Sequence, residues 1–241
     1  MHMHEGISGE SAWERDEVLA WKGRAYVYGL LGVVLARPLE LTWFKELLSD
    51  PFLSVVREME LSTTVQAGLQ NMRGAVDAQS TIERDRFIEE TVLEFQKLFL
   101  APIQGCMVPL GASSYLPQGT DLYRRRAACE ALYERFGFAW RESLTGTPGV
   151  WPNEPEHVIL ALPMLAILAD EIASSLTDPD DLAVPLEQTF RDFLSATRDW
   201  MPDCLVAIEK ATSNEFYGIF AQIARECLEA EYSMADELCS E

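Results

Sequence analysis

Apolar residues recur at three- and four-residue steps along most of the chain, which is the periodicity of an amphipathic helix. The pattern predicts six helical segments, near residues 11–37, 83–99, 122–136, 158–176, 186–200 and 205–223. Alternating apolar and polar positions, typical of a half-buried strand, are nearly absent. The sequence therefore predicts an all-α, single-domain, compact helical bundle. Its expected extent is residues 11–232, between a flexible N-terminus (1–10) and an acidic tail (233–241).

Local signals set the ends of several predicted helices. Ser11 and Glu14 have capping-box spacing, and Arg37-Pro38 ends the first helix because the residue before proline is disfavoured in the α region. Gly137 is expected to stop the third helix, and Pro163 to kink or fray the fourth. In the second helix, a polar set is expected to lie largely away from the apolar stripe. That set is Glu83, Glu90, Glu94 and Lys97.

Two stretches interrupt the helical pattern, residues 101–120 and 138–153, and both are rich in proline and glycine. They are long for connections between helices, and long ordered loops inside a domain are usually functional. Both flank the predicted helix that carries Arg124, Arg125 and Arg126. The two loops are therefore expected to lie side by side. The three arginines read most simply as a solvated face.

Charge sets this chain apart from an average one: 19 basic residues stand against 39 acidic ones, a net charge of −20. Such a chain is a poor candidate for nucleic-acid binding, which depends on lysine and arginine to neutralise phosphates. Residues 151–241 hold 19 acidic and only 4 basic side chains. This asymmetry suits a basic partner, although solubility alone explains an acidic surface equally well.

The cysteines and the apolar runs indicate a cytoplasmic protein. Five scattered cysteines, with no pair at zinc-knuckle spacing, favour neither a disulfide framework nor a metal site. Residues 1–6 lack the basic and apolar regions of a secretory signal. The longest apolar run, residues 158–169, contains Pro163 and is too short to span a bilayer. No stable membrane insertion is expected.

One short segment, residues 153–157, concentrates titratable groups before a very apolar helix. As a helix start it has Asn153 as cap, Pro155 in the first turn and Glu156 closing a capping box. As a site, it offers two acids, Glu154 and Glu156, and the imidazole of His157 to a cationic ligand or partner. The helix start is the simpler interpretation of the two.

The residues do not favour an enzyme. His157 is the only histidine beyond residue 4, so a metal site would need carboxylates for its other ligands, and nothing marks a serine or cysteine as its nucleophilic partner. Neither a P-loop nor a dinucleotide-binding glycine pattern follows a strand. A binding protein without metal or cofactor is the better prediction.

Five short motifs resemble, in order, the TorD/DmsD/NarJ family of cytoplasmic maturation chaperones for molybdenum-cofactor oxidoreductases. The resemblance covers about residues 20 to 225, and its fourth motif, 154–158, is similar to the family's E-P-D-H-I hallmark with Glu156 in place of the aspartate. The motifs are Arg24-Ala25-Tyr26 with Leu30-Leu31 and Pro38, Glu94 to Phe99, Pro109 to Tyr115, Glu154 to Val158, and Trp200-Met201-Pro202 with Phe216-Tyr217.

The resemblance implies a chaperone that binds the N-terminal twin-arginine leader of a molybdoenzyme catalytic subunit, or its apo-form, until the cofactor is inserted. It also implies a groove lined by the loop, with Phe99 beneath it and the hallmark at its polar end. The implied client-binding residues are Phe99, Pro109, Leu110, Gly111, Ser113, Tyr115, Glu154, Pro155, Glu156 and His157. Two alternatives stay open: a regulatory protein with weak GTP binding, and a generic helical scaffold in which the hallmark only starts a helix.

Overall fold

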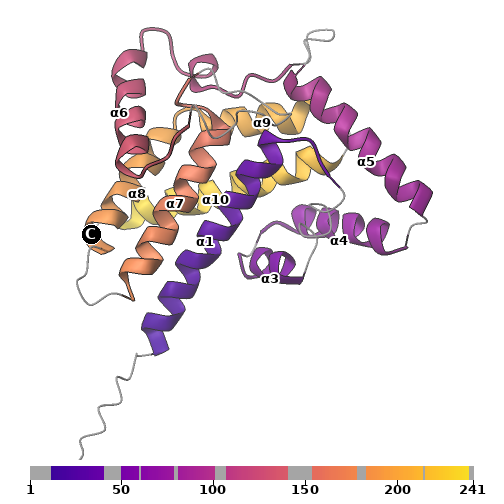
Figure 1. The fold of residues 1–241 in the computed structure, drawn as a ribbon, viewed down its shortest axis with the longest axis horizontal. Coiled ribbons are helices and arrows are strands. Elements are labelled where there is room, and N and C mark those ends of the chain that lie inside the picture. Colours follow the sequence, from indigo (N-terminus) through magenta and orange to yellow (C-terminus); the bar gives the residue numbers. More distant parts are fainter. Residues whose placement is uncertain are drawn as a thin grey trace, which may run out of the picture.

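The computed structural model describes residues 12–40, 50–59, 61–78, 81–100, 107–140, 154–177, 183–213 and 215–238. Across these ranges the chain forms nine α-helices and no β-strand, which confirms the all-α prediction (Figure 1). The helices are α1 (Ala12–Ala36), α3 (Asp50–Glu58), α4 (Thr63–Ala78), α5 (Thr81–Phe95), α6 (Leu122–Arg135), α7 (Val158–Ser175), α8 (Ala183–Thr197), α9 (Met201–Ala211) and α10 (Glu215–Leu238). A π-helical turn, η1 (Gln96–Leu100), extends α5, and a short 3-10 turn, η2 (Ala112–Ser114), lies in the loop before α6.

Helix α7 forms the centre of the core because it is apolar on nearly every side. Eleven of its residues are buried, and α1 and α8 pack along it. Helix α1 ends at Ala36, as the Arg37-Pro38 pair predicts. Its Gly32 faces Pro163, so a proline inside α7 is tolerated where a side chain is missing opposite it.

The α1–α7 crossing makes a prediction that two glycines on the same helix can test. A Cβ at Gly32 would lie 2.7 Å from Cγ and Cδ of the rigid Pro163 ring, whereas a Cβ at Gly29 would meet Ala166 at an ordinary 3.7 Å. We expect Gly32→Ala to lower the free energy of unfolding by about 2 kcal/mol, as overpacking does. Gly29→Ala, measured by the same chemical denaturation, should be neutral or slightly stabilising. Equal effects of the two substitutions would contradict the crossing.

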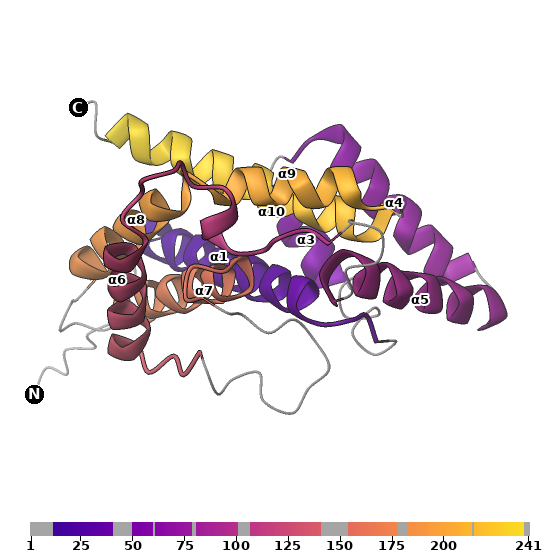
Figure 2. The same ribbon diagram turned by 90° about the horizontal axis from the view of Figure 1, so that it is seen from above.

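Helices α9 and α10 form a hairpin against the other side of α1 (Figure 2). The sequence predicted one helix over 205–223, and this is wrong: α9 ends at Ala211, and Thr212 and Ser213 break the pattern. The physical reason is a side chain of α5. The Glu94 carboxylate accepts hydrogen bonds from the Ser213 amide (2.5 Å) and hydroxyl (2.6 Å), which satisfies the turn between the two helices.

Glu94 was also expected to lie away from the buried stripe, and it is instead buried. Burial alone would raise the pKa of its carboxyl, but the hydrogen bonds from Ser213 and the charge of Lys97 outweigh burial and hold the pKa below its ordinary value. A buried, satisfied carboxylate therefore ties α5 to the α9–α10 hairpin.

Aromatic side chains join α5, η1 and α10. The ring of Tyr217 lies 5.8 Å from that of Phe95 and 5.6 Å from that of Phe99, and Phe95 and Phe99 contact each other edge to face at 5.2 Å. Such pairs stabilise beyond the area they bury. Two of the five sequence motifs, separated by more than a hundred residues, thus meet in one cluster.

Two expected boundaries differ from the structure. Helix α10 continues to Leu238, six residues into the expected acidic tail, and the Asp236 carboxylate there receives two hydrogen bonds from Arg198 (2.6 and 2.5 Å). Helix α8 ends at Thr197, short of the predicted end at Trp200. Residues 1–10, and with them the expected flexible N-terminus, lie outside the described residues, as does Ser11.

Two of the described helices are long and apolar enough to cross a membrane by length and composition alone. They cover Arg15–Ala36 and Val158–Ser175. The run at 158–169 was expected to be too short, but its helix extends to 18 residues. Because α7 is enclosed by other helices, its apolar character is accounted for by the core.

Candidate functional site

The loop before α6 and the segment before α7 pair with each other. Gly111 and His157 form an isolated antiparallel β-bridge. The Ala112 amide donates to the Glu156 carbonyl (2.8 Å), and the Val158 amide donates to the Leu110 carbonyl (2.9 Å). The third and fourth sequence motifs, about 40 residues apart, therefore form one unit, which we call the junction: residues 107–116 and 154–158.

The junction corrects the expected start of the fourth helix. Helix α7 begins at Val158, with His157 as an N-cap whose side chain makes no capping hydrogen bond. Glu156 thus closes no capping box, and Pro155 lies before the helix rather than in its first turn. The backbone of His157 is extended (φ −128°, ψ 138°), and the Glu156 carbonyl and Val158 amide on either side of it bond to the loop. Asn153 lies outside the described residues.

Glu154 is 4% exposed and is held from two sides. Its Oε2 atom lies 2.5 Å from Arg126 Nη2, and its Oε1 atom accepts a hydrogen bond from the Ser113 hydroxyl (2.8 Å). Gly111 is what makes room for this arrangement, since a Cβ at residue 111 would overlap the carboxylate and lie 2.7 Å from its Cδ. The carboxylate therefore joins α6 to the loop.

Glu156, also 4% exposed, pairs with the preceding arginine on α6. Arg125 Nε donates to Glu156 Oε1 (2.7 Å), and Arg125 Nη2 donates to the carbonyl of Ala196 at the end of α8 (2.6 Å). Asp199 lies 3.7 Å from the same guanidinium. Arg125 and Arg126 are thus no solvated face, contrary to the simplest reading of the sequence, while Arg124 is exposed.

Hydroxyl groups fix the rest of the junction. The buried Tyr133 hydroxyl donates to the carbonyl of Pro155 (2.8 Å), and the half-buried Tyr115 hydroxyl donates to that of Pro109 (2.7 Å). Cys204 of α9 contacts the same Pro109 carbonyl at 3.6 Å. These contacts join the loop to α9 and fix the carbonyls of Pro109 and Pro155.

The structure brings nine of the ten expected site residues into the junction. Phe99 is separate, buried in the aromatic cluster, although the Val108 amide bonds to the Leu98 carbonyl (2.9 Å) and carries the loop past η1. Sequence reasoning missed the partners that face the junction. These are Arg125, Arg126, Tyr133 and Cys204. The sequence contained one sign of this pairing. Two adjacent arginines and two acids two residues apart each lie next to a long predicted loop, so their charges match in number.

His157 is buried, and burial lowers the pKa of its imidazole to about 3. Its ordinary value is 6.5, so the unfolded chain takes up a proton here first and the folded state loses stability as pH falls through 6.5. We expect the free energy of unfolding to drop by about 2 kcal/mol between pH 7 and pH 5 from this group alone. His157→Gln should flatten that slope in urea titrations. Glu94 and Glu226, whose pKa values are lowered, act chiefly below pH 5.

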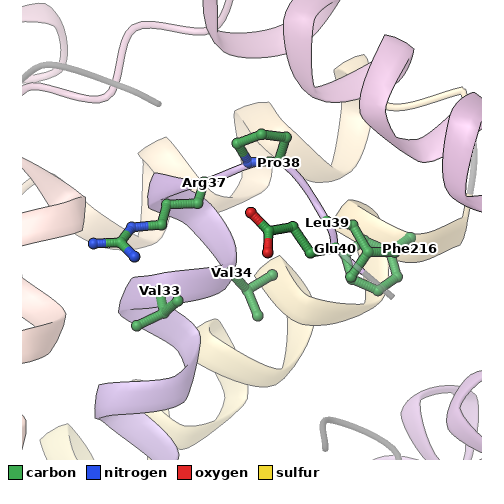
Figure 3. A pocket seen from close by; sticks show the side chains of 7 residues that line it. All are labelled: Val33, Val34, Arg37, Pro38, Leu39, Glu40 and Phe216. Atoms are coloured by element: carbon green, nitrogen blue, oxygen red, sulfur yellow. The ribbon is translucent and has the colours of Figure 1, made fainter. Parts of the chain in front are cut away.

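The enclosed hollows of the described residues are small. One of about 100 Å³ lies at the end of α1 against α10, well below the size of usual ligand pockets (Figure 3). It is lined by Val33, Val34, Arg37, Pro38, Leu39, Glu40 and Phe216. Larger hollows of about 490 and 590 Å³ are open grooves. The junction thus presents a surface rather than a deep pocket.

Within the ranges that the structure describes, no three histidine, cysteine or acidic side chains cluster as metal ligands. Cys129 and Cys204 are free and buried, and burial raises the pKa of each thiol to about 12, which keeps them protonated.

No protein-family model, curated protein or solved structure matches the chain.

Proposed function

We propose that the protein is a cytoplasmic chaperone that binds the leader, or the apo-form, of a molybdopterin-dependent oxidoreductase subunit and holds it until the cofactor is inserted. The observation that carries the proposal is the junction itself. Two motifs of the family resemblance, far apart in sequence, pair through one β-bridge between Gly111 and His157. A third motif supplies the helix beneath them, through Cys204 and Pro109.

Exposed apolar side chains of the junction loop and of η1 suit the apolar part of a leader. In the junction loop Met107 is 48% exposed and Pro109 is also exposed, and Leu100, the last residue of η1, is 42% exposed. The hydrogen bond from the Val108 amide to the Leu98 carbonyl joins this loop to η1. A loop that is held by hydrogen bonds and displays apolar side chains binds an extended peptide at a lower cost in ordering than a free one. The acidic surface contributed by residues 151–241 attracts the basic start of a leader at longer range.

Co-purification tests the proposal. The tagged full-length protein, expressed in its native host, is expected to retain a molybdoenzyme catalytic subunit in its cofactor-free form. A matched control carries Met107→Asp and Leu100→Asp, which place charge on the exposed apolar surface without touching the core. If the protein with both substitutions no longer retains the subunit, the exposed apolar surface is the binding site. Recovery of no molybdoenzyme subunit with the unaltered protein would contradict the function.

A further inference from the structure

Helix α6 is the least embedded of the described helices. The closely packed pairs are α1–α7, α9–α10 and α7–α8, and α6 belongs to none of them. Only Cys129 and Tyr133 of its fourteen residues are buried. Both views place α6 at the edge of the molecule (Figures 1 and 2). Its attachment therefore depends on a few side chains rather than on a packed face.

The N-terminal half of α6 is attached by charge. Arg125 and Arg126, adjacent in sequence, each contact one buried carboxylate of the junction, Glu156 and Glu154. The apolar anchor, Tyr133, lies two turns further along. Glycines with positive φ flank the helix on both sides, Gly119 (φ 91°) and Gly137 (φ 65°). The two ion pairs therefore hold the first half of α6, whereas the buried Cys129 and Tyr133 hold the second half.

The attachment leaves polar atoms unsatisfied. Glu156 Oε2 and Arg126 Nε are buried and have no hydrogen-bond partner among the described residues. A cavity of about 10 Å³ also lies between α6, α7 and α8, lined in part by Cys129, Glu156 and Trp200. A buried polar atom without a partner costs free energy, so a ligand that also reaches Glu156 Oε2, and leaves the Arg126 guanidinium to water, would bind the carboxylates better than α6 does.

We propose that α6 occupies the junction as an internal competitor, and that a peptide with two adjacent arginines displaces it to pair with Glu154 and Glu156. The ligand class follows from the occupant: neighbouring guanidinium groups are what the two carboxylates already hold. Lysine is a weaker substitute because its ammonium group lacks the planar fork that meets a carboxylate with two hydrogen bonds. The inference rests on the proposed function, since it names the part of a leader that the polar end of the site recognises.

A matched pair of variants separates competition from general charge. Arg126→Ala vacates Glu154, and Arg124→Ala removes the same charge from the same helix at an exposed position. The probe is a synthetic peptide of an Arg-Arg pair followed by an apolar stretch. Because Arg126→Ala removes one of the two ion pairs that close α6, this variant should bind the peptide about tenfold more tightly, or more, than the unaltered protein. Arg124→Ala should differ little from the unaltered protein. Equal affinities of the two variants would overturn the proposal.

Hydrogen exchange of the unaltered protein provides a second test that does not depend on a variant folding. Saturation with the Arg-Arg peptide should speed amide exchange in residues 122–128, while a peptide with Gln-Gln in place of the arginines should not. Unchanged or slower exchange of α6 would overturn the competition. If a molybdoenzyme subunit is recovered despite that result, the proposed function stands and only the competition by α6 is contradicted. If Arg126→Ala binds the peptide more tightly but no subunit is recovered, the arginine site stands and the proposed function is contradicted.

Discussion

Gly111→Ala is expected to lower the free energy of unfolding by about 3 kcal/mol, because the new methyl group overlaps a buried carboxylate that cannot move away freely. The backbone is not the obstacle, since residue 111 has φ −98° and ψ 146°, which alanine adopts readily. The obstacle is Glu154, whose side chain is fixed by Arg126 and Ser113. Moving it would break both interactions.

The control for this prediction is Gly74→Ala in α4, where an added Cβ meets no atom within 4 Å. Alanine is the better helix former, so this substitution should stabilise the protein by about 0.5–1 kcal/mol. Both changes are measured by urea denaturation at pH 7. A Gly111→Ala protein as stable as the unaltered one would mean that the loop and the Glu154 side chain do not meet.

Glu156→Gln is expected to cost about 3 kcal/mol, because it leaves the Arg125 guanidinium without its closest anionic partner. Part of the full cost of breaking a buried pair is avoided, since Arg125 retains the Ala196 carbonyl and is 21% exposed. This outcome differs from that of a capping-box glutamate, for which glutamine is a good replacement. The substitution thus separates the two interpretations of the segment.

Two further variants make the Glu156 prediction specific. Glu134→Gln removes the same charge from an exposed position on α6 and should change stability by less than about 0.5 kcal/mol. In a double-mutant cycle, Arg125→Gln combined with Glu156→Gln should cost less than the sum of the single changes. Strict additivity would show that the two side chains do not interact.

The helical architecture could be predicted from the sequence because it depends on a local signal, the spacing of apolar residues. The end of α1 before Pro38 and the end of α6 near Gly137 follow from backbone sterics of single residues, and both are observed. The break between α9 and α10 could not be predicted, because the apolar spacing continues through Thr212 and the cause is a carboxylate from another helix.

The candidate site shows the same division. The two motifs of the junction could be recognised in the sequence, but their pairing could not, since a single β-bridge leaves no alternating pattern. The sequence presents Glu154 and Glu156 as acids available to a ligand, whereas folding gives each of them an arginine. Arg125 and Arg126 look like surface residues because their partners lie about 30 positions away. Long-range charge pairing is invisible to any reading of local periodicity.

The central claim, that the junction and the exposed surface beside it bind a client leader, is tested most directly by site-specific photo-crosslinking. A photoreactive phenylalanine derivative replaces Met107, which is 48% exposed in the junction loop, or Ile82, which is 80% exposed at the far end of α5. Each protein is illuminated with the full-length apo-subunit recovered from the host, and the linked peptides are identified by mass spectrometry. The account predicts crosslinks from residue 107 to the N-terminal leader and few from residue 82. Crosslinks to the leader from residue 82 with none from residue 107 would contradict it.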